Sequence, residues 1–148
     1  MKCIIFIGIQ ASGKSTFFKD YFFYSYVRIS KDLLKTRNKE NLFIDLCINT
    51  GQKFVIDNTN ATKELRKDYI SKIKTRKYKI IGYYFESKIN DCINRNNLRD
   101  GKEKIPEKGI LGIYNKLELP SLDEGFDELY YVSIINSKFH IKEWNNEI

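Results

Sequence analysis

Two glycines, a lysine and a hydroxyl stand in the spacing G-x-x-x-x-G-K-[ST] within the segment Gly8–Thr16. Glycine permits backbone dihedrals that let successive N–H groups face one anion, and a helix beginning there adds partial positive charge. Lys14 is placed to bridge the β- and γ-phosphates of a nucleoside triphosphate, and the Ser15 hydroxyl to bind Mg²⁺. A turn without a ligand is the alternative, but the flanking strand and helix favour a phosphate-binding loop. The residues expected to bind the nucleotide are Gly8, Gln10, Ala11, Ser12, Gly13, Lys14, Ser15 and Thr16.

A second group of reactive side chains follows two further expected strands. Asp32 is suited to orient an attacking hydroxyl and to take its proton, as a kinase requires of a carboxylate. Asp57 could hold a Mg²⁺-bound water, while Asn58 and Thr59 could position the acceptor of a transferred phosphoryl group. The alternatives are that Asp32 only complements a helix dipole and that the cluster at Asp57 caps the next helix.

Arg95 and Arg99 lie four residues apart and are expected on one face of a helix, next to a polar stretch at 100–104. Arginines on a closing lid can neutralise a transferring phosphoryl group, although a solvated basic face is the alternative. The N-K-x-D motif of the switch GTPases is absent from the sequence. A small phosphotransferase, whose lid excludes water from the reacting phosphate, fits these features best.

Alternating strand-like and amphipathic segments must bring these groups together. The expected strands are Lys2–Ile7, Val27–Ser30, Lys53–Asp57, Lys79–Phe85 and Leu129–Ile135. The expected helices are Lys14–Tyr24, Asp32–Ile48, Thr62–Thr75, Lys88–Leu98 and Glu107–Leu117. This order predicts an α/β fold, with a mostly parallel central sheet of about five strands flanked by helices. Ligands bind at the carboxyl ends of such strands. The last dozen residues are ambiguous, but Trp144 is expected to pack.

The composition favours one cytoplasmic domain over residues 1–148. The chain is 42% hydrophobic and 30% charged, which excludes intrinsic disorder, and the apolar run 3–7 is too short for a membrane span or a signal peptide. We therefore expect no membrane partner. Three widely spaced cysteines without a CxxC motif indicate a reducing compartment, and zinc is not expected.

The net charge of +7 favours anionic partners, and its distribution is uneven. The segment 63–79 carries eight basic residues against two acidic ones, whereas 118–128 carries five acidic residues and no basic one. A nucleic-acid backbone could bind the basic stripe, although a solvated helix is the alternative. Tyr21, Tyr24 or Tyr26 could stack on a base, but packing of helix on sheet is the simpler interpretation.

Together these motifs resemble the 5′-hydroxyl polynucleotide kinases, including the kinase domains of phage and animal end-repair enzymes. The resemblance spans residues 2 to about 135. It includes Gly8–Thr16, Ile29–Asp32, Val55–Asn60, Arg95 and Arg99 followed by Ile105–Pro106, and Leu119–Phe126. It implies a P-loop kinase fold with a helical lid at about 95–106, ATP and Mg²⁺ as cofactors, Asp32 as general base, and Arg99, with Arg95, as the lid clamp.

The implied activity is transfer of the ATP γ-phosphate to the 5′-hydroxyl end of DNA or RNA, in nucleic-acid repair. The residues expected to bind this acceptor are Asp32, Lys35, Asp57, Asn58, Thr59 and Arg66. The family often has arginine at the position of Lys35, and lysine lacks the bidentate fork. Because the chain has no D-x-D-G-T phosphatase motif and no room for a ligase, a separate phosphatase or ligase is an expected partner.

Two other functions stay open at this point. A small-molecule kinase of the same fold would phosphorylate a sugar, nucleoside or antibiotic. A nucleotide-dependent binding module would close its lid on ATP without any acceptor, which would leave Asp32 without a task. The sequence does not distinguish DNA from RNA as acceptor, or ATP from GTP as donor.

Overall fold

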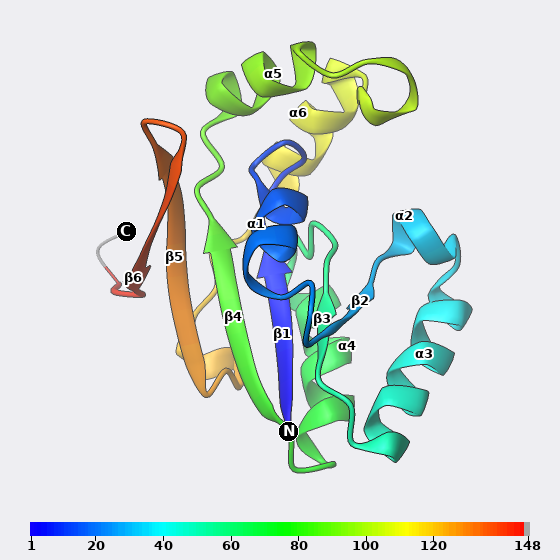
Figure 1. Ribbon diagram of the computed structural model, residues 1–148. Coiled ribbons are helices and arrows are strands. Elements are labelled where there is room, and N and C mark those ends of the chain that lie inside the picture. The colour runs from blue at the N-terminus through cyan, green and yellow to red at the C-terminus, as the bar shows by residue number, and fades with distance from the viewer. Residues whose placement is uncertain (147–148) are drawn as a thin grey trace.

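The computed structural model describes residues 1–146, and its centre is a six-stranded sheet (Figure 1). The strands are β1 (Lys2–Ile7), β2 (Val27–Ile29), β3 (Phe54–Ile56), β4 (Lys79–Phe85), β5 (Glu128–Ile135) and β6 (Lys138–Glu143). Their order across the sheet is β2-β3-β1-β4-β5-β6; the first five strands are parallel, and β6 runs antiparallel to β5. The expected α/β fold with a mostly parallel sheet is confirmed.

Six helices and two short 3₁₀ turns connect the strands. They are α1 (Lys14–Tyr21), α2 (Lys31–Leu34), α3 (Arg37–Thr50), α4 (Lys63–Lys74), α5 (Ile89–Asn97) and α6 (Glu107–Lys116), with η1 (Gly101–Glu103) and η2 (Leu122–Glu124). Alternate residues of β1 enter two cores, as the strand period of two requires. Ile5 packs in one core with Ile44 of α3 and Ile73 of α4, and Phe6 packs in the other with Phe17 of α1. Helices therefore cover both faces of the sheet.

The single helix predicted over Asp32–Ile48 is wrong, because the structure divides this segment into α2 and α3. Lys35 ends α2 with a left-handed φ of 74°, and its N–H donates to the Lys31 carbonyl. The Thr36 hydroxyl then accepts from the Lys39 N–H and begins α3 as its N-cap. The short α2 consequently presents Asp32 at the edge of the sheet instead of in a long helix.

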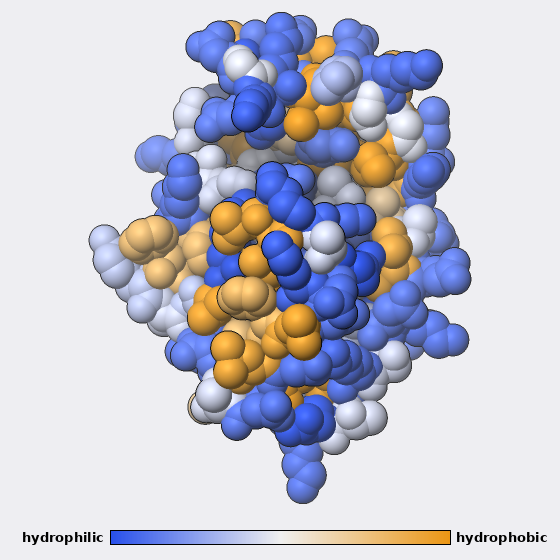
Figure 2. Space-filling view, turned by 90° about the vertical axis from the view of Figure 1, so that its right-hand side faces the viewer, coloured by the Kyte–Doolittle hydropathy of each residue, from blue (hydrophilic) through white to orange (hydrophobic). Residues whose placement is uncertain are grey.

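Helix α3 buries one stripe and exposes another. Ile44, Cys47 and Ile48 lie in the core at helical spacing, whereas the large exposed apolar residues of α2 and α3 are Leu33, Leu42, Phe43 and Leu46. Figure 2 shows this side of the molecule, with an apolar patch among hydrophilic residues.

The strand β6 lies in the segment that the sequence leaves ambiguous, since charged side chains interrupt its apolar pattern. It forms a hairpin with β5, and the Trp144 ring packs 5.5 Å from the ring of Tyr84, as expected of this residue. The hairpin also reaches the loop after β1. A Cβ on Gly13 would lie 3.0 Å from Ile134 Cδ1 and 3.1 Å from Phe139 Cε1. Within the described residues, no helix has the length and apolar character needed to cross a membrane.

Candidate nucleotide and acceptor site

The phosphate-binding loop runs from the end of β1 to the start of α1. Its first N–H, from Gly8, donates to the Thr59 carbonyl at 3.0 Å, which joins the loop to the segment after β3. A Cβ on Gly8 would lie 2.8 Å from Ser12 Oγ and 3.0 Å from Phe85 Cβ. Gly13 takes a φ of 103° immediately before α1. Both glycines of the motif are therefore required by the path of this backbone.

Lys14 is buried and folds back over the loop that it follows. Its Nζ donates to the carbonyl of Ile9 at 2.7 Å, to that of Gly8 at 2.9 Å and to Ser12 Oγ at 3.5 Å. Burial lowers the pKa of Lys14 from 10.5 to about 8, and the negative charge of Asp57 partly opposes this shift. The ammonium group is thus available to exchange loop oxygens for the oxygens of an incoming phosphate.

Three neighbouring cavities surround the loop. The hairpin cavity, of about 610 Å³, lies between the loop, α1, the residues Arg95 and Arg99 and the β5–β6 hairpin. The loop cavity, of about 120 Å³, contains Lys14 and Ser15. The α2 cavity, of about 340 Å³, lies between α2, α3 and the segment after β3. The first two share Ala11, Gly13, Thr16 and Arg99, and the last two share Gln10, Asp32, Asn58, Thr59 and Ile105.

Asp32 lies where the loop cavity meets the α2 cavity. It is in the first turn of α2, and the Lys31 N–H beside it donates to Asn58 Oδ1 at 2.8 Å, which fixes the start of this helix. Gln10 borders the same two cavities, and its buried Oε1 has no hydrogen-bond partner among the described residues. Figure 2 shows this side of the molecule hollowed between the lid segment (residues 95–106) and α2.

The segment after β3 holds several elements in place. Asn58 also donates from Nδ2 to Glu40 Oε2 at 2.7 Å, and Asn60 donates from Nδ2 to the Phe6 carbonyl at 2.7 Å. Thr59 borders both the loop cavity and the α2 cavity, and its carbonyl holds the start of the phosphate-binding loop. The structure therefore gives this segment a positioning task in addition to its place beside the α2 cavity.

Asp57 and Ser15 converge on one guanidinium group. Arg28 of β2 donates from Nε to Asp57 Oδ2 at 2.7 Å and from Nη2 to Ser15 Oγ at 3.4 Å. Two oxygen donors around a single positive charge fit Mg²⁺, which takes one or two protein ligands and completes its shell with phosphates and water. Residues 1–146 contain no cluster of three or more His, Cys, Asp and Glu that could hold a metal alone.

The two lid arginines have different surroundings. Arg95 of α5 donates from Nε to the Ala11 carbonyl at 2.7 Å, so it is attached to the phosphate-binding loop. The helix ends at Asn97, and Arg99 therefore lies in the turn after it and not on the helical face that the spacing predicts. Arg99 borders both the hairpin cavity and the loop cavity. The buried Asn96 closes the lid segment by hydrogen bonds to both the N–H and the carbonyl of Ile105.

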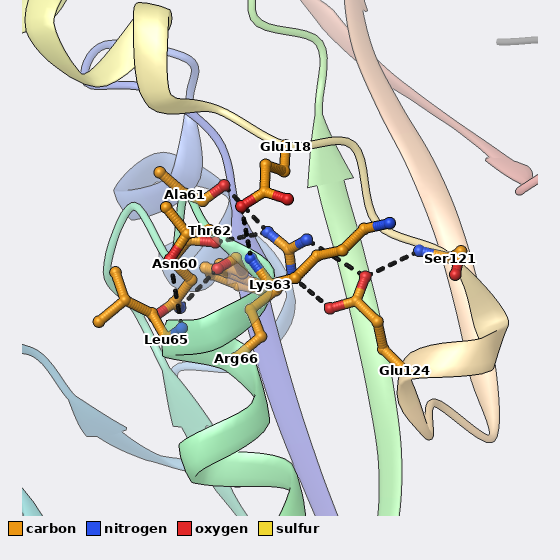
Figure 3. Close-up of polar contacts among 10 residues, drawn as sticks. Asn60, Ala61, Thr62, Lys63, Leu65, Arg66, Glu118, Ser121 and Glu124 are labelled. Atoms are coloured by element: carbon orange, nitrogen blue, oxygen red, sulfur yellow. Dashed lines mark hydrogen bonds and ion pairs between the residues drawn. The ribbon is translucent and has the colours of Figure 1, made fainter.

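Arg66, expected among the acceptor-binding residues, lies in the interior, which corrects that expectation (Figure 3). Its side chain is 0% exposed and forms a two-bond ion pair with Glu124, at 2.7 and 3.2 Å. Its Nη1 donates to the carbonyls of Asn60 and Ala61 at 2.8 and 3.2 Å. The guanidinium group thus joins the segment after β3 to η2. Arg66 precedes Tyr69, Ile70 and Ile73 on the buried face of α4, and this helical spacing could have revealed its burial.

Arg37, and not the expected Lys35, lines the α2 cavity. Lys35 is exposed at the end of α2 and is not among the described residues that line the loop cavity or the α2 cavity. Arg37 lines the α2 cavity; its guanidinium carbon lies 4.9 Å from the centre of the Tyr69 ring, and its Nε lies 3.8 Å from Glu40 Oε1. Burial, followed by the charge of Glu40, raises the pKa of Tyr69 to about 12. Sequence reasoning missed Arg37 because it assumed one continuous helix here.

Comparisons with known proteins agree with the fold and with the motifs. No protein-family model matches the chain. It is 26% identical over 147 residues to a bifunctional polynucleotide phosphatase/kinase of Schizosaccharomyces pombe, covering 96% of this chain and 36% of that protein. It is 30% identical over 142 residues to a provisionally named protein of the same kind from Acanthamoeba polyphaga mimivirus, covering 91% of this chain and 34% of that one. The chain thus spans about a third of the length of these relatives.

Three solved structures share the fold. A sugar kinase from Janibacter sp. HTCC2649 has a TM-score of 0.67 at 12% identity, covering 90% of this chain and 85% of that one. Kti12 of Chaetomium thermophilum, in complex with ADP-AlF₃, has 0.62 at 14%, covering 88% of each chain. A chain of the Pnkp1/Rnl/Hen1 RNA repair complex has 0.60 at 17%, covering 78% of this chain and 43% of that one.

The sheet, the loop and these likenesses define the fold as that of the P-loop kinases. Within that class, the resemblance to the polynucleotide kinase family, which the motifs indicate, is confirmed by the two curated relatives.

Proposed function

We propose that this domain transfers the γ-phosphate of ATP to the 5′-hydroxyl end of DNA or RNA. The observation that carries the proposal is the position of Asp32, which borders both the loop cavity and the α2 cavity. A carboxylate at that junction can contact a hydroxyl that enters from the α2 cavity while the phosphates lie on the loop. The names of the curated relatives support a polynucleotide as the acceptor.

Each step follows from groups on the two sides of this junction. Lys14 and the loop N–H groups bind the β- and γ-phosphates, and Arg99 faces them from the lid segment. Asp32 accepts the proton of the 5′-hydroxyl as the acceptor oxygen bonds to the γ-phosphorus, and the bond from that phosphorus to the bridging oxygen breaks to release ADP. Mg²⁺ held by Ser15 and, through water, by Asp57 would add positive charge at the phosphates.

The donor nucleoside is assigned to the hairpin cavity, because this cavity adjoins Gly13 and Thr16 at the start of α1. Arg95 and Arg99 border the cavity on the lid side and Phe139 on the hairpin side. On the acceptor side, Lys31 and Arg37 place positive charge in the α2 cavity. That charge suits the internucleotide phosphate next to a 5′-hydroxyl end better than it suits a neutral sugar. In nucleic-acid repair, a separate phosphatase or ligase would supply the other steps.

The test is transfer of ³²P from γ-labelled ATP to matched DNA and RNA oligonucleotides with 5′-hydroxyl ends. Oligonucleotides with 5′-phosphate ends are the negative control, and a set of sugars and nucleosides is the competing acceptor. We expect label on the 5′-hydroxyl ends and its loss in Asp32→Asn. Label on the small molecules alone would replace the polynucleotide by a small acceptor. Nucleotide binding without any labelled product would refute transfer altogether.

A further inference from the structure

Arg28 has no place in the scheme above, although it lies inside the loop cavity. It projects from the middle of β2 and lines this cavity together with Lys14, Asp32 and Arg99. Its contacts are the two groups expected to hold the divalent cation, Asp57 Oδ2 at 2.7 Å and Ser15 Oγ at 3.4 Å. A guanidinium group therefore lies where the metal ion is expected.

We propose that Arg28 is the counter-ion of Asp57 when no metal is bound, and that it competes with the divalent cation for Asp57 and Ser15. The inference rests on the proposed function only in taking Asp57 and Ser15 as the metal side of a nucleotide site. Nε and Nη2 are bonded to the same carbon, so the two oxygens face one small volume. A guanidinium and a divalent cation repel each other, and the Asp57 oxygen that would accept from a metal-bound water already accepts from Arg28. One must therefore leave when the other binds.

The fold gives Arg28 a route for leaving. β2 is one of the two edge strands of the sheet, and β3 is the only strand within residues 1–146 that pairs with it. The side chain of Arg28 is 31% exposed, whereas that of Asp57 is 3% exposed. The arginine can consequently swing towards solvent or towards a phosphate, while the carboxylate stays where β3 ends.

A resident arginine also explains how the buried carboxylate is tolerated in the absence of metal. Lys14, another nearby cation, donates its hydrogen bonds to the Gly8 and Ile9 carbonyls and to Ser12 Oγ, and not to Asp57. An ionised carboxylate that is nearly inaccessible to water needs a partner, and Arg28 provides one. The arginine thus keeps the metal side of the cavity formed before the cation arrives, and weakens the binding of that cation.

The test is Mn²⁺ binding to the full chain at the same concentration of free ADP for every variant. The electron paramagnetic resonance signal of free Mn²⁺ measures the binding. We expect Arg28→Gln to bind Mn²⁺ about fivefold more tightly than the unchanged chain, because a competing ion pair is removed. Arg76→Gln, on an exposed arginine outside the cavities, is the matched control and should leave the Mn²⁺ affinity unchanged. Without divalent cation, Arg28→Gln should bind ADP more weakly, because the cavity has lost a positive charge.

The double variant Arg28→Gln with Asp57→Asn locates the competition at the carboxylate. We expect it to bind Mn²⁺ no more tightly than Asp57→Asn alone. An unchanged or lowered Mn²⁺ affinity in folded Arg28→Gln overturns the proposal, since the arginine would then be neutral or helpful to the metal. If Arg28→Gln does not fold, Arg28→Met replaces it under the same criterion. Failure of phosphoryl transfer to any acceptor refutes the proposed function but leaves the Mn²⁺ competition intact, so the two failures are distinguishable.

Discussion

Both cavities take their lining from segments between residues 10 and 105, but six residues that line the loop cavity come from the continuous segment 10–16, whereas Gln10 alone of that segment lines the α2 cavity. The first kind of site has a sequence signature because one stretch of backbone must wrap one anion. The second depends on how α2, α3 and the segment after β3 are held together. The proposed donor side is therefore largely local in the sequence, while the proposed acceptor side depends on the whole fold.

The largest expected effect comes from Asp32, which lies where the loop cavity meets the α2 cavity. Asp32→Asn should lower the rate of transfer to a 5′-hydroxyl oligonucleotide by about 10²–10⁴-fold, because the amide cannot take the proton. ADP affinity, measured by calorimetry, should change little. Asp45→Asn, on the exposed ion pair with Lys72, is the control and should keep the rate. A near-normal rate in Asp32→Asn would remove the general-base assignment.

The next effect concerns the support of the α2 side. Arg66→Met leaves the Glu124 carboxylate without its partner, and we expect a loss of about 3–5 kcal/mol in the free energy of unfolding. Urea unfolding followed by circular dichroism measures it. Lys67→Met changes the neighbouring, exposed position of α4 and should cost little. A loss below about 1 kcal/mol in Arg66→Met would mean that the ion pair does not stabilise this segment.

A smaller effect distinguishes Arg37 from Lys35 as the residue that binds the acceptor. Arg37→Gln should raise the KM for the oligonucleotide roughly tenfold, because a charged hydrogen-bond donor in the α2 cavity is lost. The affinity for ADP should be kept. Lys35→Gln should have the weaker effect, since Lys35 is exposed at the end of α2. The reverse order of KM values would return the acceptor role to Lys35.

The smallest effect is a pH dependence on the donor side. Phosphate favours the ammonium form of Lys14, so binding raises a pKa that burial has lowered to about 8. Protons are therefore taken up on binding at alkaline pH, and ADP affinity should fall about threefold from pH 7.5 to pH 8.5. Calorimetry in buffers of different ionisation enthalpy would detect the uptake. Lys14→Met should bind more weakly and lose this dependence; an unchanged slope would exclude Lys14 as its source.

The same contrast decides what the sequence could predict. The loop, the parallel strands and Asp32 can be predicted from contiguous patterns in the sequence. In the structure, the loop and Asp32 line one cavity beside the sheet that these strands form. The break between α2 and α3 requires a positive φ at Lys35, for which the sequence gives no signal, although Thr36 is a recognisable N-cap. Arg66 looks like part of a solvated basic stripe because its partner Glu124 lies 58 positions away.

The two hydrogen bonds between Asn96 and Ile105 have a consequence for closure. They fasten both ends of the intervening turn to one buried amide, so residues 97–104 cannot fold over the loop independently of α5. When α5 moves, the turn and Arg99 therefore move with it as one rigid unit. The pivots must then lie outside this unit, in the connections from β4 to α5 and from α6 towards β5.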